Sequence, residues 1–265
     1  MPHVIDLPDA DAEVMNTTPC TSVHALTADP YLVGGNDDRF TGFGIMGLPF
    51  SSGHYLALRS MVASSVGPAY RTVWHRDPEG EWTIYTTTDP ERSCPRYFVG
   101  SDHAVRVSAI DLRWQDDWTL NVALDTDTTK GTRLAWQVRL GSGLATRAMT
   151  TMGGATPQWA WNSTAVLQVM GPMASGVLGS GRIRLAGTAP NGQRFRAAPL
   201  RVWRVVESTA TLSGEDFGDP APLDTQARLG DFWLPQRGLF FVGRARFGTD
   251  VRTSEGGRRT VGIGT

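Results

Sequence analysis

A histidine and an aspartate two positions apart, His75 and Asp77, are the first residues whose types and spacing suggest chemistry. Alternate side chains of a strand share one face, so the two would point the same way. A carboxylate beside an imidazole can orient a general base, which predicts catalytic roles for both residues. Pro78 and Gly80 follow them and are typical of a turn. The alternative is therefore that His75 lies at the rim of a hairpin and Asp77 caps its turn.

The segment 231–237 holds a second candidate site, just before a predicted closing strand. Loops at the ends of a β-barrel commonly contact ligands, which predicts that Trp233 binds a ligand and that Asp231 acts as an acid. In the alternative interpretation, Asp231 and Arg237 form a salt bridge that fixes the loop, and Trp233 packs beneath it. The proton donors that the sequence offers for acid–base catalysis are His75, Asp77, Tyr97 and Asp231.

A run of 34 residues without Asp, Glu, Lys or Arg extends from Ala148 to Gly181. Its apolar residues recur at helical spacing, which predicts a helix that is interrupted near Gly171 and Pro172. Three interpretations stay open: a buried helix that plugs one end of a barrel, an apolar lid over a ligand cavity, or a helix on a membrane surface. In the lid interpretation, the ligand-binding residues of this segment are Trp159, Trp161, Met170 and Met173.

The sequence carries no intact motif for a nucleotide, a metal or a covalent nucleophile. Residues 42–47, GFGIMG, match a dinucleotide-binding pattern, but LPFSSG follows where that loop requires a helix. We expect a bent, glycine-rich strand there instead. Cys20 and Cys94 are too few for a thiolate cage, and the spacing of His54 and His103 does not bring them to His75. We therefore expect no cofactor, no metal site and a buried, unreactive Cys94.

Composition excludes several classes of protein. Hydrophobic residues make up 40% of the 265 residues and charged residues 19%, and the formal net charge is -1. These values exclude a disordered chain and provide no basic excess for binding nucleic acid. The acidic N-terminus and the lack of a long apolar run predict a cytoplasmic protein with no transmembrane segment, whose cysteines are reduced thiols.

Strands dominate the sequence outside the charge-free segment. Apolar and polar residues alternate in 118–124 and 133–140, as is typical of half-buried antiparallel strands. Turn residues at 77–80 and 190–192 predict two hairpins, and GLFFVGRARF at 238–247 predicts a closing strand. Ten or more short strands without alternating helices predict a mainly β fold, either an antiparallel barrel or a strongly curved sheet, with one helical insertion.

These patterns divide one integrated domain into four parts. We expect an irregular N-terminal arm over 1–40, a first β block over 41–143, the charge-free helical insertion over 144–181 and a second β block over 182–265.

Three segments, RTVWHRDPEGEWTIYT, GRIRLAGTAPNGQRFRA and FWLPQRGLFFVGRARF, resemble in strand rhythm and hairpin style the lipocalin-like proteins of the AttH and carotenoid 1,2-hydratase families. The resemblance covers most of the chain after Thr41 and includes no diagnostic motif. It implies a lipocalin-like barrel, or a pair of abutting barrels, with an apolar cavity. Members of these families hydrate isoprenoid double bonds, and related proteins cyclise polyketide or terpenoid chains without a cofactor.

Two classes of function follow. The first is a β-barrel protein that binds an apolar small molecule, such as a lipid, an isoprenoid or a polyketide-like compound, beneath the 148–181 segment. The second is a cofactor-independent hydratase, isomerase or cyclase that uses the same cavity and acid–base catalysis. A purely structural role is the third interpretation.

Overall fold

One large sheet forms the framework of the computed structural model, which describes residues 17–99, 103–126 and 131–248. Among the described residues, strands account for 44% and helices for 22%. The strands are β1 (Asp38–Pro49), β2 (Tyr55–Ser64), β3 (Tyr70–Arg76), β4 (Trp82–Thr86), β5 (Ala104–Arg106), β6 (Ile110–Trp114), β7 (Thr119–Asp125), β8 (Arg133–Gly141), β9 (Ala186–Thr188), β10 (Arg194–Leu212), β11 (Glu215–Asp216), β12 (Arg228–Leu229), β13 (Phe232–Trp233) and β14 (Leu239–Gly248).

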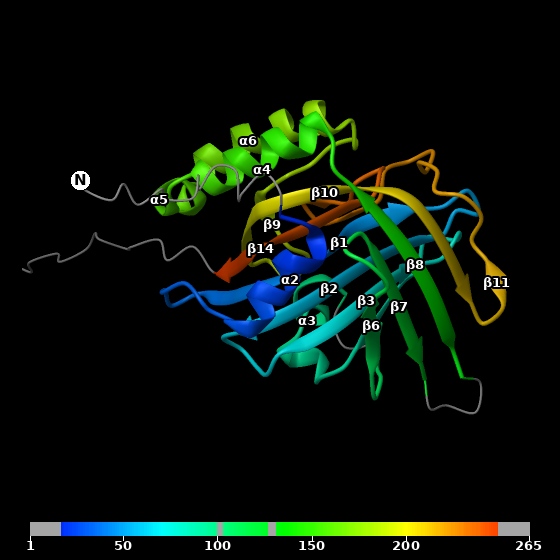
Figure 1. Ribbon diagram of the computed structural model, residues 1–265. Coiled ribbons are helices and arrows are strands. Elements are labelled where there is room, and N and C mark those ends of the chain that lie inside the picture. Colours follow the sequence, from blue (N-terminus) through cyan, green and yellow to red (C-terminus); the bar gives the residue numbers. More distant parts are fainter. Residues whose placement is uncertain (1–16, 100–102, 127–130, 249–265) are drawn as a thin grey trace, which may run out of the picture.

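The order of the strands joins the two predicted β blocks into one sheet. Along the main path the order is β5-β4-β3-β2-β1-β14-β10-β8-β7-β6, and β9 and β11 pair with β10. The C-terminal strand β14 lies between β1 and β10, antiparallel to both. The sheet curls strongly (Figure 1) but is not closed into a barrel. The prediction of a closed barrel is therefore wrong, and the alternative of a curved sheet agrees with the structure.

The local predictions for strands and hairpins are largely confirmed. Strands β3 and β4 pair across the 77–80 turn, and β9 and β10 pair across the turn that contains Gly192, whose φ is 85°. In β8, exposed and buried residues alternate without interruption as far as Leu140. The glycine-rich segment 42–47 lies within β1, where a Cβ on Gly44 would collide with the Leu58 carbonyl oxygen. Only glycine permits so close a contact with β2.

Two faces of the sheet carry separate apolar clusters. Inside the curl, residues of β1–β4 face residues of β6–β8, and Val23 and Leu26 of helix α2 (Pro19–Ala28) pack against them. Outside it, an aromatic cluster lies beneath the short helix α3 (Pro95–Phe98) and strand β13. The faces alternate as expected along β3, because Val73 belongs to the inner cluster and Trp74 to the outer one.

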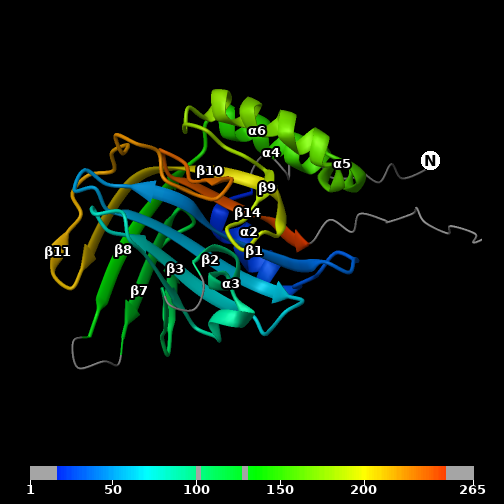
Figure 2. The ribbon, with the colours of Figure 1, turned by 180° about the vertical axis from the view of Figure 1, so that it is seen from behind.

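A helical layer covers another part of the outer face, where the sequence predicts it (Figure 2). It consists of α4 (Leu144–Ala155), α5 (Gln158–Asn162) and α6 (Thr164–Leu178), which bury Met149, Trp161 and Leu167 among others. The expected interruption near Gly171 and Pro172 is wrong, because α6 continues through both residues. Pro172 lies on the exposed side of the helix, where water can satisfy the carbonyl oxygen that its missing N–H leaves free.

The predicted irregular N-terminal arm contains helix α2, so that prediction is wrong for residues 19–28; residues 1–16 lie outside the described part of the chain. Thr18 caps this helix by accepting a hydrogen bond from the Thr21 amide, and Pro19 occupies the first turn. Both are ordinary signals for a helix start. A 3-10 turn, η1 (Pro90–Arg92), precedes α3. No helix among the described residues is both long and apolar enough to span a bilayer.

Candidate functional site

Arg59 is a buried arginine in the middle of β2, where it is only 5% exposed. The pairing of β1 with β2 shifts register between Ile45 and Leu48, and such a bulge locally disrupts the hydrogen-bond ladder. The guanidinium donates to carbonyl oxygens at this irregularity, from Nη1 to Ile45 and from Nη2 to Met46 at 3.0 Å. Nη1 also donates to the Leu58 carbonyl at 2.9 Å. The backbone carbonyl oxygens at the bulge therefore hold the guanidinium in position.

These bonds engage three of the five N–H donors of Arg59. Within the described chain, no carboxylate forms an ion pair with it. The guanidinium instead lies over the rings of Trp74, at 4.9 Å, and Phe241, at 5.4 Å. Burial lowers the pKa of Arg59, and the Cys94 thiol opposes this most strongly. An arginine remains charged in proteins, so the site holds a buried positive charge that no carboxylate of the described residues neutralises.

A cavity of about 70 Å³ lies beside this charge, on the outer face of the sheet. Two methionines, Met46 and Met61, line it together with residues of β14 and α3. The charged lining residues are both arginines, Arg59 and Arg244, and Arg244 donates to Gln158 at 2.7 Å. The aromatic part of the lining consists of Phe40, Tyr70, Trp74, Tyr97, Phe98, Phe232, Phe241 and Phe247. The cavity is thus aromatic, with positive charge and no negative charge at its wall.

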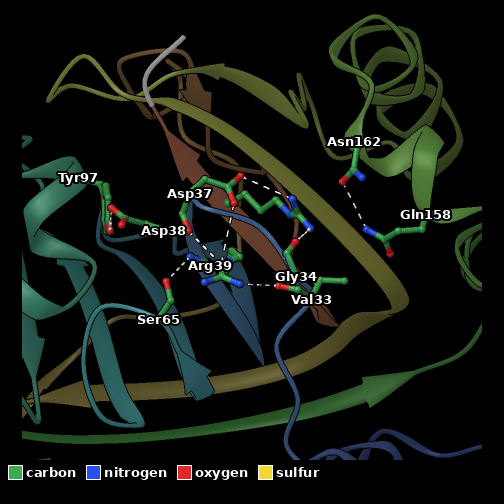
Figure 3. Close-up of polar contacts among 10 residues, drawn as sticks. Val33, Gly34, Asp37, Asp38, Arg39, Ser65, Tyr97, Gln158 and Asn162 are labelled. Carbon is green, nitrogen blue, oxygen red and sulfur yellow. Dashed lines mark hydrogen bonds and ion pairs between the residues drawn. The ribbon is translucent and has the colours of Figure 1, made fainter. Parts of the chain in front are cut away.

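Three groups that carry protons also line the cavity: Tyr70, Cys94 and Tyr97. The Tyr70 hydroxyl and the Cys94 thiol lie 3.4 Å apart, and burial raises the pKa of both groups. Tyr97 donates to Asp38 at 2.9 Å (Figure 3), and burial again raises its pKa. All three therefore stay neutral at physiological pH. Tyr97 is one of the predicted proton donors, and Cys94 is buried as expected.

The start of β1 and the loop before it hold the part of the cavity wall near Tyr97 in place. Arg39 donates to the carbonyl oxygens of Val33, at 2.9 Å, and Asp37, at 3.0 Å, while its amide donates to Ser65 (Figure 3). Because Asp38 adjoins Arg39, these bonds hold the carboxylate that receives the Tyr97 hydroxyl.

His75 lies on the opposite face of the sheet, in contact with His54 rather than Asp77. Its Nε2 lies 2.9 Å from His54 Nδ1, and His54 Nε2 lies 3.1 Å from Glu215 Oε1. Phe217 stacks on the His54 ring with centroids 3.9 Å apart. Burial, reinforced by His54, lowers the pKa of His75 to about 4. The expectation that His54 does not approach His75 is wrong, because the pairing of β2 with β3 brings the start of one strand to the end of the other.

Asp77 caps the turn after β3, as the alternative interpretation predicts. Its carboxylate accepts the Glu81 amide at 2.8 Å, and its carbonyl oxygen accepts the Gly80 amide. The negative charge of the carboxylate raises the pKa of His75, but this effect is smaller than the lowering by burial and by His54. An orienting hydrogen bond between Asp77 and His75 is therefore absent from this part of the described structure.

Asp231 and Trp233 lie in an ionic cluster away from the cavity. Asp231 pairs with Arg184 at 2.7 Å and accepts the Thr188 amide at 3.1 Å. The predicted salt bridge with Arg237 is wrong, because the chain turns Asp231 toward the segment before β9. Trp233 is half-buried, with the guanidinium groups of Arg182 and Arg228 over its ring at 4.9 and 5.5 Å. Its neighbour Phe232 lines the cavity.

The four predicted ligand-binding residues of the helical layer do not line the Arg59 cavity. Trp159 is 70% exposed and Met173 54% exposed, so both point away from the sheet. Trp161 is buried among the core residues beneath the layer, and Met170 packs against the same residues. The helical layer covers the sheet beside the cavity. Two of the four side chains therefore face solvent, and the other two pack in the core beneath the layer.

The sequence offered one signal for Arg59 that was missed: it is the only charged residue in the apolar run YLALRSMVA, which forms β2. A charge within a strand buried on both faces requires a partner or a function. Within residues 17–99, 103–126 and 131–248, no group of three or more His, Cys, Asp or Glu residues lies where it could hold a metal ion.

Comparisons with known proteins do not place the chain in a family. No protein-family model matches it, and no curated protein matches it. Its structure is similar to the crystal structure of acetoacetate decarboxylase from Legionella pneumophila subsp. pneumophila str. Philadelphia 1, with a TM-score of 0.33 and 11% identity. The likeness covers 94% of this chain and 96% of that one. At this TM-score it carries no argument about function. The resemblance to the AttH and carotenoid 1,2-hydratase families stays a prediction.

Proposed function

We propose that this protein binds a small apolar anion, a short monocarboxylate, in the cavity beside Arg59. One observation carries the proposal: Arg59, a residue that is 5% exposed, lines an aromatic cavity and has no carboxylate partner among the described residues. A buried charge that has hydrogen bonds but no counter-charge still costs free energy, and an anionic ligand would supply that counter-charge. Arginine suits this role because its planar fork can donate two parallel hydrogen bonds to a carboxylate.

The size of the cavity limits the size of the ligand that can bind. A buried water needs at least about 10–15 Å³, so a cavity of about 70 Å³ has room for a ligand of only a few non-hydrogen atoms. This favours a carboxylate with a short chain over the long isoprenoid or lipid that the sequence suggested. Met46 and Met61 are flexible, and their movement could admit one or two further carbons.

Binding is favoured over acid–base catalysis for a physical reason. An efficient general acid has a pKa near the working pH. The proton-bearing groups at the cavity wall, Tyr70, Cys94 and Tyr97, have pKa values that burial raises above their ordinary values. They can donate hydrogen bonds to a ligand, but they are weak acids. The predicted candidates His75, Asp77 and Asp231 do not line the cavity.

Thermal denaturation with pairs of ligands tests this proposal. The pairs are acetate with acetamide, butyrate with butyramide and octanoate with octanamide. At a concentration of 100 times its Kd, a ligand stabilises by about 2.7 kcal/mol, which raises Tm by about 5 °C for a chain of this size. We expect a saturable rise with butyrate and none with butyramide. Equal shifts with acid and amide, or a shift with octanoate alone, would contradict the proposal.

A further inference from the structure

Two tyrosine hydroxyl groups lie at the wall of the Arg59 cavity. Tyr70 and Tyr97 are both buried, and both line the cavity. Their rings pack edge to face against Phe40, with centroid distances of 6.2 and 5.8 Å, so they belong to the same part of the wall. A buried hydroxyl group costs free energy unless it is hydrogen-bonded, so the partners of these two groups indicate what a ligand must supply.

Tyr97 offers an acceptor to a ligand. Its hydroxyl lies 2.9 Å from a carboxylate oxygen of Asp38, and the same carboxylate lies 3.8 Å from the guanidinium of Arg96. An ionised carboxylate accepts hydrogen bonds and donates none, so the Tyr97 proton goes to Asp38. The Tyr97 oxygen keeps a lone pair, with which it can accept a proton from a ligand.

Tyr70 offers a donor, because of a series of hydrogen bonds along β3. The indole N–H of Trp74, which can only donate, bonds to the Thr72 hydroxyl at 3.1 Å. Thr72 bonds in turn to the Cys94 thiol, whose sulfur lies 3.4 Å from the Tyr70 hydroxyl. When each group donates to the next, the Tyr70 oxygen accepts from the thiol, and its own proton has no acceptor among the described residues. A thiol is in any case a weak partner, so an oxygen atom of a ligand would bind this hydroxyl better.

The strand register places Arg59 and Tyr70 where one small ligand can contact both. Arg59 on β2 pairs directly with Thr72 on β3, so Tyr70 is its diagonal neighbour on the same face of the sheet. Diagonal neighbours are about 7–8 Å apart, within reach of long and aromatic side chains. The positive charge of Arg59 also acts on Tyr70, where it opposes the rise in pKa that burial causes. A ligand whose carboxylate binds Arg59 therefore has its carbon chain within reach of the Tyr70 hydroxyl.

We propose that the ligand is a short hydroxy-carboxylate, and that Tyr70 is the residue that selects its hydroxyl group. This inference rests on the proposed function, because it requires that Arg59 binds the carboxylate. A hydroxyl group has one proton to donate and lone pairs to accept, which match the acceptor at Tyr97 and the donor at Tyr70. An alkyl chain would leave both groups unused, and an oxo group would use only the donor.

Calorimetric titration with isosteric acids tests the inference. 3-Hydroxypropionate differs from butyrate by a hydroxyl in place of the terminal methyl, and lactate differs in the same way from isobutyrate. We expect the wild-type chain to bind at least one hydroxy acid about 10-fold more tightly than its isostere, which is the gain from about one hydrogen bond. In Tyr70→Phe this preference should disappear, while the affinity for butyrate should change by less than about 3-fold.

Tyr85→Phe is the matched control, because Tyr85 is a buried tyrosine of the inner cluster that does not line the cavity. That variant should keep the preference, and circular dichroism establishes that both variants fold. If butyrate binds through Arg59 but neither hydroxy acid binds more tightly than its isostere, the inference is overturned and the proposed function stands. This comparison requires only the wild-type chain. Tighter binding of pyruvate than of lactate, or a preference that persists in folded Tyr70→Phe, would also overturn the inference. A wild-type chain that binds none of these acids would overturn the inference and the proposed function together.

Discussion

Two buried polar sites lie on opposite faces of the same strands, and they satisfy their polar groups in different ways. On the outer face, Arg59 keeps a positive charge beside a cavity and has no acidic partner in the described chain. On the inner face, His54 and His75 bond to one another, and Phe217 stacks against both rings. The first arrangement leaves donors available to a ligand. In the second arrangement, the polar atoms bond to other groups of the protein.

The ring nitrogens of the histidine pair are engaged in hydrogen bonds within the protein. If His75 donates its Nε2–H to His54 Nδ1, then His54 can donate its Nε2–H to Glu215. Every proton in this chain of bonds then has an acceptor. The comparison shows that burial of a titratable group does not by itself mark a functional site. An unmatched charge at a cavity is the more informative feature.

Replacement of Phe217 should give the largest change in stability. Phe217 is fully buried and supports both histidine rings, so Phe217→Ala should lower the free energy of unfolding by about 3–5 kcal/mol in urea denaturation. Binding of butyrate at the opposite face should persist while the protein is folded. Tyr31→Ala, at a side chain that is 43% exposed, is the control and should change stability by less than about 0.5 kcal/mol. A loss below about 1 kcal/mol for Phe217→Ala would show that the pair does not depend on this ring.

Acid should weaken the fold through His75. The pKa of His75 is about 4 in the folded protein and near 6.5 in the unfolded chain, so the unfolded chain takes up the proton first as the pH falls. The contribution to stability is complete above about pH 6.5 and is lost as the pH falls toward 4, by up to about 3 kcal/mol.

The dependence of urea midpoints on pH measures this contribution. His75→Gln should flatten the profile between pH 4 and 6.5, whereas His103→Gln, at an exposed position, should leave it unchanged. An unchanged slope in His75→Gln would assign the acid sensitivity to other groups.

Filling the cavity should weaken binding more than it changes stability. Ala245 lines the cavity, and Ala245→Leu would occupy part of its volume. We expect the affinity for butyrate to fall about 10-fold and the free energy of unfolding to change by less than about 1.5 kcal/mol. Ala123→Leu, at an exposed position of β7, is the matched control for added volume. Unchanged affinity in Ala245→Leu would place the ligand elsewhere.

Asp231→Asn should have the smallest effect. The pair with Arg184 is about 40% exposed, and such pairs contribute at most about 1 kcal/mol after screening by solvent. We expect a loss of stability below that value and no change in butyrate affinity. A large loss of affinity would return Asp231 to the binding site that the sequence suggested.

The sequence predicted the parts of this fold that depend on local pattern. Strands β7 and β8 alternate because one face meets the inner cluster and the other meets solvent. The 77–80 and 190–192 turns contain residues that favour turns. The joining of the two β blocks into one sheet was not predictable in this way, because it depends on the pairing of β14 with β1, about 200 residues apart.

Most of the candidate site could not be predicted from the sequence for the same reason. The cavity combines β1, β2, β3, β10, β14 and α3, which are distant in sequence. His54 meets His75 only through the register of β2 and β3, which the spacing of 21 residues does not reveal. The sequence showed that the helical layer is apolar, but it did not show which face of each helix meets the sheet. Trp159 and Met173 were therefore expected at a pocket, although both are exposed.

Calorimetric titration of butyrate into the wild-type chain, Arg59→Lys and Arg59→Met tests the central claim most directly. Truncating one partner of a buried charge pair costs 2–5 kcal/mol, so Arg59→Met should lose about 100-fold or more in affinity. Arg59→Lys keeps the charge without the planar fork and should fall between the two. Arg71→Met, an exposed position on β3, should bind like the wild type, and circular dichroism reports folding of each variant. Wild-type affinity in folded Arg59→Met, or equal binding of butyrate and butyramide by the wild-type chain, would contradict the claim.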